Sequence, residues 1–113
     1  MGRLGYVPER GHIVKLNFSP TRGHEQKGYR PALVISTKDY NTLTHRAIVC
    51  PITSKLYRYP FVVFIHGKVS GSILVDQIRS IDWQARLVKH AGECSAEIMN
   101  EVASQLFAIA QGK

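Results

Sequence analysis

Apolar and polar positions alternate along most of the chain in a way that predicts short β-strands. In residues 12–18, "HIVKLNF", the apolar side chains of Val14, Leu16 and Phe18 alternate with polar ones, and a period of two is typical of a strand with one buried face. Further apolar runs predict strands at residues 31–36, 45–52, 60–66, 72–78 and 86–90. About six short strands in so few residues favour a small, highly curved barrel.

The period changes near the C-terminus, where residues 95–110 predict one amphipathic helix. Apolar residues recur there at helical spacing, namely Ile98, Val102, Leu106 and Ile109. Ser95 is a suitable N-cap because its hydroxyl can accept a hydrogen bond from the first turn. We therefore expect a mainly β fold with a C-terminal amphipathic helix, in a single domain over residues 1–113.

Five connections interrupt this pattern. Residues 19–30 contain one proline, two glycines and no apolar run, which predicts a loop of about twelve residues. A loop of that length in a small domain is usually functional or disordered. The other connections are a turn or helical turn at 38–42, a basic and aromatic loop at 53–59, a glycine-rich hairpin connection at 67–72 and a bend at 79–85.

The positive charge is unevenly distributed. The net charge is +7, and residues 1–60 carry ten Lys and Arg against three acids, whereas residues 61–113 carry five of each sign. The whole excess therefore lies in the first half. A basic surface with aromatic side chains suits a polyanion, above all single-stranded RNA. An acidic protein partner or a merely solvated cationic surface would produce the same charge pattern.

Several classes of protein are disfavoured. No stretch of about 18 apolar residues occurs, so we expect no membrane span, and the N-terminus does not resemble a signal peptide. Cys50 and Cys94 are the two cysteines; we expect both to be reduced in a cytoplasmic protein, with Cys50 in the core. The histidines show no ligand spacing, and no phosphate-binding or dinucleotide motif is present, so we expect no metal and no cofactor.

A few polar residues are candidates for chemistry. They are His24, Glu25 and Arg30 from the loop, Thr53 and Ser54 after a strand, and Asp76 within an apolar strand. Taken singly, each has an ordinary structural interpretation, such as a solvated acid, an ion pair or a turn cap. Together they describe a site, because sequential strands usually pair and would bring Arg30 and Thr53 to one rim of the barrel.

Such a rim could cleave RNA without a metal if the 2′-hydroxyl is the nucleophile. The reaction needs a base for that proton, an acid for the leaving 5′-oxygen, and donors for the charge on the phosphate. Arg30 offers paired planar donors for phosphate. The base could be Glu25, His24 or Arg30. An arginine stays charged at neutral pH, which favours Glu25 or His24 as the base and leaves Arg30 as the phosphate clamp and the candidate acid. The loop would then act as a catalytic flap.

Three blocks of sequence resemble the MazF/PemK/Kid family of bacterial toxins. They are "GHIVKLNFSPTRGHEQKGYRPALVIS", "VCPITS" and "DQIRSIDWQAR", and the resemblance extends from Tyr6 to about Ile109. It implies an SH3-like barrel, a homodimer, and a metal-independent, sequence-specific endoribonuclease that inhibits growth. Such enzymes cut single-stranded RNA, with messenger RNA as the expected target, and leave a 2′,3′-cyclic phosphate and a 5′-hydroxyl. A cognate acidic, MazE-like antitoxin inhibits them.

The resemblance also implies roles for individual residues. Arg30 and Thr53 match the family's catalytic pair, Glu25 matches its loop acid, and His24 matches a catalytic histidine of other members. Asp76 matches an aspartate that those members use together with this histidine. Leu74 stands where they have an arginine, two residues before that aspartate, which leaves the role of Asp76 open and concentrates the chemistry on Arg30. The expected RNA-binding residues are Gln26, Lys27, Tyr29, Ser54, Lys55, Arg58, Asp76, Gln77 and Arg86.

Two alternatives share this fold. Related toxins poison DNA gyrase and are not enzymes, but they use a C-terminal aromatic residue, whereas this chain ends "FAIAQGK". The other alternative is a catalytically inactive RNA-binding module. That module would tolerate the loss of Glu25, Arg30 or Thr53, all of which are present.

Overall fold

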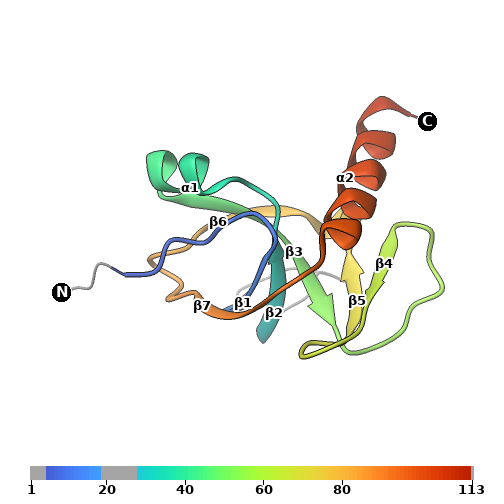
Figure 1. The fold of residues 1–113 in the computed structure, drawn as a ribbon, viewed down its shortest axis with the longest axis horizontal. Coiled ribbons are helices and arrows are strands. Elements are labelled where there is room, and N and C mark those ends of the chain that lie inside the picture. The colour runs from blue at the N-terminus through green and yellow to red at the C-terminus, as the bar shows by residue number, and fades with distance from the viewer. Residues whose placement is uncertain (1–4, 19–27, 113) are drawn as a thin grey trace.

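The computed structural model describes residues 5–18 and 28–112, in which antiparallel strands form one curled sheet next to a C-terminal helix (Figure 1). The strands are β1 (His12–Asn17), β2 (Tyr29–Val34), β3 (Arg46–Thr53), β4 (Val62–Ile65), β5 (Gly71–Leu74), β6 (Arg79–Asp82) and β7 (Lys89–Glu93). Their order is β4-β5-β3-β2-β1-β7, and β6 also pairs with β3. The long strand β3 is therefore shared by β2, β5 and β6.

Three helical segments accompany this sheet in the described part of the chain. Helix α1 (Lys38–Thr44) connects β2 to β3, the 3-10 helix η1 (Val75–Gln77) follows β5, and α2 (Ala96–Gln111) ends the described chain. The Ser95 hydroxyl accepts a hydrogen bond of 3.1 Å from the Ile98 backbone N–H. This confirms Ser95 as the N-cap of α2 and so explains where the helix begins.

The core lies on both faces of the central strands. One cluster contains Ile13, Leu33 and Ile52 and is covered by Met99 and Val102 of α2. The other cluster lies on the opposite face and contains Val14, Leu16, Phe18, Ala32, Val34, Ala47, Val49 and Ile81. Because successive side chains of a strand point to opposite faces, β1 and β2 supply residues to both clusters.

The mainly β fold, the barrel-like curvature and the C-terminal helix are confirmed. The predicted bounds of the first three strands are correct to within two residues at each end. Cys50 is fully buried and both cysteines are free, as expected. No helix among the described residues is long and apolar enough to span a membrane.

Three details of the prediction are wrong. The strand expected at 72–78 ends at Leu74, and Asp76 lies in η1. The bend expected at 79–85 contains β6, whose single buried residue, Ile81, gave too weak an alternation to detect. The last strand is β7 instead of residues 86–90, because Leu87 adopts a positive φ of 51° in an exposed turn. The turn or helical turn expected at 38–42 is indeed helical and extends to Thr44 as the seven-residue helix α1.

Candidate functional site

Arg30 and Thr53 lie at the same edge of the sheet. Ala32 of β2 pairs with Pro51 of β3 in antiparallel register, and Arg30 and Thr53 are the next residues on that face, two positions further along each strand. On its other side, Arg30 pairs with Leu16 of β1. Arg30 and Thr53 are therefore cross-strand neighbours on one face of the sheet, with a guanidinium on one strand and a hydroxyl on the next.

Thr53 is fixed in place by its neighbours. Its side chain is almost fully buried, and its hydroxyl oxygen accepts a 3.4 Å hydrogen bond from the Lys55 backbone N–H. On the β5 side it pairs with Ser72. Gly71, with a φ of +147°, lies against the Thr53 carbonyl, and a Cβ added there would be 2.0 Å from that oxygen. The sequence suggested only a glycine-rich hairpin at this position, so the need for Gly71 in placing Thr53 was missed.

The basic and aromatic loop after β3 is tied to β5 by one buried hydroxyl. The Ser72 side chain donates a 2.7 Å hydrogen bond to the Lys55 carbonyl and accepts one of 3.3 Å from the Tyr57 backbone N–H. Ser54, Lys55 and Arg58, which the sequence predicts to bind RNA, are all exposed on this loop. Their backbone is thereby held beside Thr53 while their side chains face solvent.

Asp76 has a partner within this loop. The Tyr59 hydroxyl donates a 2.5 Å hydrogen bond to Asp76 Oδ2, and this bond, followed by the negative charge, raises the pKa of Tyr59. Asp76 is exposed, and Gln77 beside it is half-buried. Burial, and secondarily the charge of Asp76, raises the pKa of the Cys50 thiol to about 12. The carboxylate of Asp76 therefore raises the pKa of an exposed tyrosine and of a buried thiol.

Two further arginines lie near the end of β1, next to the end of β2 that carries Arg30. Arg86 Nη1 donates a 2.6 Å hydrogen bond to the Asn17 carbonyl, and Asn17 pairs with Tyr29. The Arg79 guanidinium carbon lies 5.4 Å from the centre of the Phe18 ring, at the end of β1. Arg79 was missed as a candidate, although it belongs to the third quoted block of sequence.

Four predicted site residues lie outside the described residues, namely His24, Glu25, Gln26 and Lys27. The catalytic flap expected over 19–30 falls mostly on this segment. The described residues on either side of it are joined, because the Phe18 backbone N–H donates a 2.8 Å hydrogen bond to the Gly28 carbonyl. Tyr29, directly after Gly28, is 60% exposed.

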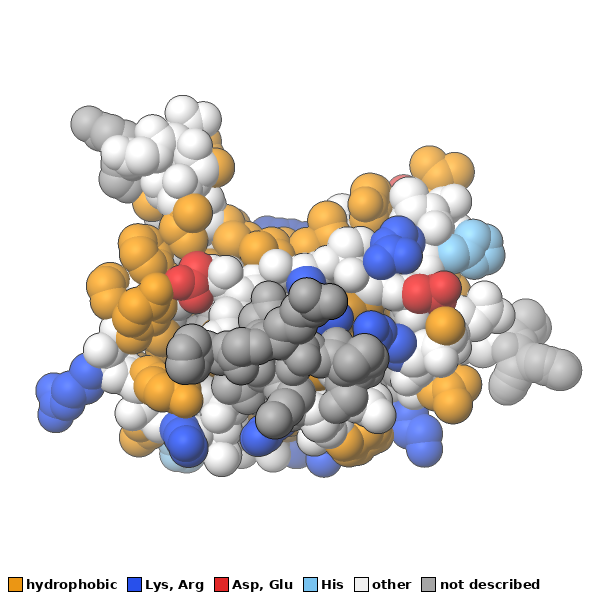
Figure 2. Space-filling view, turned by 180° about the vertical axis from the view of Figure 1, so that it is seen from behind, with side chains coloured by type: hydrophobic (Ala, Val, Ile, Leu, Met, Phe, Trp, Pro, Cys, Tyr) orange, Lys and Arg blue, Asp and Glu red, His pale blue; other side chains and the backbone are white. Residues whose placement is uncertain are grey.

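Charged and apolar surfaces gather in different places. Figure 2 shows Lys and Arg side chains in the middle of one face and along its lower edge. Hydrophobic side chains cover the side of that view next to the protruding C-terminal helix. The exposed hydrophobic residues of the β4 region and of α2 include Leu56, Tyr59, Phe64, Phe107 and Ile109.

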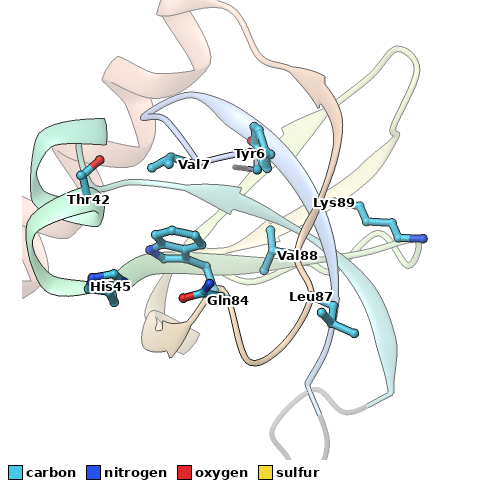
Figure 3. A pocket seen from close by; sticks show the side chains of 10 residues that line it. Tyr6, Val7, Thr42, His45, Gln84, Leu87, Val88 and Lys89 are labelled. Atoms are coloured by element: carbon cyan, nitrogen blue, oxygen red, sulfur yellow. The ribbon is translucent and has the colours of Figure 1, made fainter. Parts of the chain in front are cut away.

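A separate open pocket of about 790 Å³ lies between the N-terminal segment, α1 and the turn after β6 (Figure 3). Its wall includes the stacked rings of His45 and Trp83, whose centres are 6.0 Å apart. The Trp83 indole N–H donates a 3.0 Å hydrogen bond to the Asn41 carbonyl of α1. None of the predicted site residues lines this pocket, and Trp83 serves to attach α1 to the sheet.

Comparisons with known proteins agree with this fold. The structure of MazF from Deinococcus radiodurans superimposes with a TM-score of 0.89 and 43% identity, covering 96% of this chain and 100% of that one. MazF in a MazE–MazF complex from the same organism gives a TM-score of 0.82 at 39% identity, over 94% of this chain and 97% of that one. The curled sheet with its C-terminal helix is thus the fold of the MazF toxins.

The sequence comparisons specify the family. Residues 9–109 match the PemK-like, MazF-like toxins of type II toxin–antitoxin systems. The Escherichia coli endoribonuclease toxin ChpB is 42% identical over 110 residues, which is 91% of this chain and 94% of ChpB. The Escherichia coli endoribonuclease toxin MazF is 36% identical over 102 residues, covering 89% of this chain and 92% of MazF. The chain belongs to the PemK-like, MazF-like toxin family.

Proposed function

We propose that this protein is an endoribonuclease toxin that cleaves single-stranded RNA at specific sequences. The observation that carries the proposal is the placement of Arg30 and Thr53 at one edge of the sheet, in a chain whose relatives are named endoribonucleases. An RNA phosphodiester held at this edge meets a cation and a hydroxyl together. Messenger RNA in the cytoplasm is the expected target.

The proposed reaction is a transesterification within the RNA. The 2′-oxygen attacks the neighbouring phosphorus, a base takes its proton, and the bond from phosphorus to the 5′-oxygen breaks. That 5′-oxygen takes a proton from the general acid, for which Arg30 is the candidate, so the products are a 2′,3′-cyclic phosphate and a 5′-hydroxyl. Arg30 donates to the phosphate oxygens as charge develops, with Thr53 as a neutral donor. Glu25 or His24 is the base, on the sequence argument.

The surroundings of Arg30 favour a flexible RNA strand. Tyr29 is exposed and can stack on a base, as aromatic residues do in proteins that bind single strands. Arg86 lies at the same edge, and Lys55 and Arg58 extend the positive surface along the loop after β3. Since the proposed contacts of the arginine and lysine side chains are with phosphate, we expect RNA binding to weaken as salt rises.

The same basic surface suits an acidic antitoxin. MazF proteins are found in complexes with MazE, and we propose a MazE-like partner for this chain. An acidic segment, disordered when alone, would cross the positive surface and exclude RNA. Crosslinks from the antitoxin to residues 1–60 would support this, and crosslinks confined to residues 61–113 would contradict it.

We also propose that the toxin is a homodimer. The C-terminal part of α2 exposes Phe107 and Ile109, which are 65% and 42% accessible, and Figure 1 shows this end of the helix projecting beyond the sheet. A domain of this size buries a limited apolar area by itself. A second copy that covers this helix would place two RNA-binding edges in one particle.

One experiment tests the proposed function. The purified protein is incubated with a long RNA in EDTA, and the new 5′ ends are mapped. Cleavage at a recurring sequence, abolished by deoxyribose at only the cleaved nucleotide, is the expected result. Binding without cleavage would indicate an inactive RNA-binding module. Neither binding nor cleavage, with inhibition of DNA gyrase, would indicate a gyrase poison. Cleavage of the deoxyribose-containing substrate would exclude the 2′-hydroxyl as nucleophile.

A further inference from the structure

Three potential metal ligands meet at the outer edge of the sheet. His12 at the start of β1 and His90 and Glu93 of β7 each offer one ligand atom, and these atoms all lie within 4.8 Å of one another. His12 Nε2 is 3.9 Å from Glu93 Oε2, and His90 Nε2 is 3.8 Å from the same oxygen. The sequence predicts no metal site, because one of the three residues is far from the other two in the chain.

A β-bulge turns these side chains to one face. His12 pairs with Glu93 and Val14 pairs with His90, and the register shifts between Ile13 and Val14. In a regular strand His90 and Glu93 would point to opposite faces, since they are three residues apart. The extra residue in β7 changes this, because a bulge re-aims the side chains that follow it.

The distances are close to those of a zinc site. Zinc binds imidazole nitrogen and carboxylate oxygen at about 2.0–2.2 Å, so neighbouring ligands of a tetrahedral site are about 3.4 Å apart. The observed 3.8 and 3.9 Å exceed this by about half an ångström. The remaining separation, between the two histidine nitrogens, lies within 4.8 Å and so exceeds it by up to about 1.4 Å. The His90 and Glu93 side chains are 43% and 68% exposed, so they can move that far. Two histidines and one carboxylate, with water as fourth ligand, form a known zinc donor set.

A fourth residue can orient the first ligand. The Tyr6 hydroxyl lies 2.6 Å from His12 Nδ1, and Figure 3 shows Tyr6 on the N-terminal segment beside this part of the sheet. When His12 Nδ1 carries the proton and donates to the Tyr6 oxygen, Nε2 is free to bind a metal. Outer-shell partners of this kind fix the tautomer of metal-binding histidines.

We propose that His12, His90 and Glu93 bind one zinc ion, with Tyr6 orienting His12. In the described part of the chain β7 pairs only with β1, so the ion would join this edge strand to the sheet. His12 and Leu16 are four residues apart on β1, about 13 Å along a strand, and Leu16 is the residue that pairs with Arg30. The proposed zinc site is therefore separate from the RNA site and supports the fold.

The test uses the intact protein after removal of metals with EDTA. Zinc is titrated by calorimetry, and Co²⁺ is added to a second sample for its visible spectrum. We expect one zinc per chain, the intense visible bands of four-coordinate Co²⁺, and a thermal midpoint that rises with zinc concentration. EDTA should lower the midpoint and leave RNA cleavage unchanged, so a failure of this proposal is distinguishable from a failure of the proposed function.

Variants locate the site. Glu93→Gln, at an exposed side chain, and His90→Ala should each weaken zinc binding by about 100-fold or more, and Tyr6→Phe by about tenfold. His66→Ala is the matched control, because His66 is exposed and lies outside the cluster. No zinc uptake by the wild type would overturn the proposal. The proposal would also be overturned if Glu93→Gln and His90→Ala bound zinc as tightly as the wild type. A loss of zinc binding in His66→Ala would overturn it too.

Discussion

Gly71 is in direct contact with the Thr53 carbonyl, across the ladder that joins β5 to β3. A Cβ at position 71 would lie 2.0 Å from the carbonyl oxygen and 2.9 Å from the carbonyl carbon of Thr53. The position of the Thr53 hydroxyl at the candidate site therefore depends on a residue that carries no functional group.

Gly71→Ala should destabilise the protein and displace Thr53. The positive φ costs about 1–3 kcal/mol for alanine, and the close contact adds about 1–3 kcal/mol of overpacking. Gly67→Ala is the control, because Gly67 has a similar φ of +152° with no atom within 4 Å of an added Cβ. Urea denaturation should show a larger loss for Gly71→Ala. Equal losses would mean that backbone strain alone matters.

Arg30→Lys should lower turnover by about 10²–10³-fold, as expected when one donor to developing charge is lost. RNA affinity should change little, because lysine keeps the charge but lacks the planar fork. Single-turnover cleavage and a separate binding measurement distinguish the two effects. Thr53→Ala should cost less, since only a neutral donor is removed.

Arg58→Lys is the control for this substitution, because Arg58 is exposed on the loop after β3 and is proposed to contact only phosphate. It should retain nearly full turnover. If Arg30→Lys cleaves RNA as fast as Arg58→Lys, Arg30 only attracts the substrate, and Glu25 and His24 are the remaining catalytic candidates.

The buried Cys50 thiol should make stability fall at alkaline pH. Its pKa in the folded protein is about 12, whereas an unfolded cysteine ionises near about 8.5. Between these values the unfolded chain loses a proton that the folded chain keeps, so stability decreases with rising pH by up to about 1.4 kcal/mol per unit. Below about pH 8 the thiol contributes no pH dependence, because it is protonated in both states.

Urea denaturation of the wild type and Cys50→Ala between about pH 8 and 10.5 measures this effect. The cavity left by Cys50→Ala lowers stability by the same amount at each pH, so only the slopes are compared. The wild type should show the steeper decline. Parallel curves would show that the Cys50 thiol ionises in the folded protein as readily as in the unfolded chain.

Phe107→Glu should weaken the proposed dimer by at least about tenfold, because a charge would enter an apolar contact. Sedimentation at micromolar concentration measures the change. Leu43→Glu is the control, since Leu43 is 82% exposed on α1 and lies outside the proposed contact. A wild type that is monomeric at this concentration, or equal effects of both variants, would show that α2 does not form the interface.

The sequence predicted the elements whose pattern is local. The alternation in β1 and the helical spacing in α2 identified both elements, because burial on one face leaves a period that is visible without a structure. Arg30 and Thr53 could be placed together because they end neighbouring strands. Strand β6 was missed, since Ile81 is its only buried residue, and one residue opposite Ala47 of β3 leaves no alternation to detect.

The rest of the site depends on contacts that no local pattern records. Arg79 meets Phe18 through the packing of β6 beside β3, and Arg86 reaches Asn17 across a turn. His12 comes into contact with His90 and Glu93 only because a bulge shifts the register of β7. Arrangements of this kind follow from the register of the whole sheet, which a single sequence does not specify.

The sharing of β3 among three partner strands has a consequence for amide hydrogen exchange. Its amides are flanked by β2 on one side and by β5 and β6 on the other, so they should exchange only when the whole domain opens. Thr53 ends this strand. A cellular protease that acts on locally opened segments should therefore cut β3 only after the domain unfolds, whereas the proposed antitoxin segment, disordered when alone, would be open to cleavage whenever it is unbound.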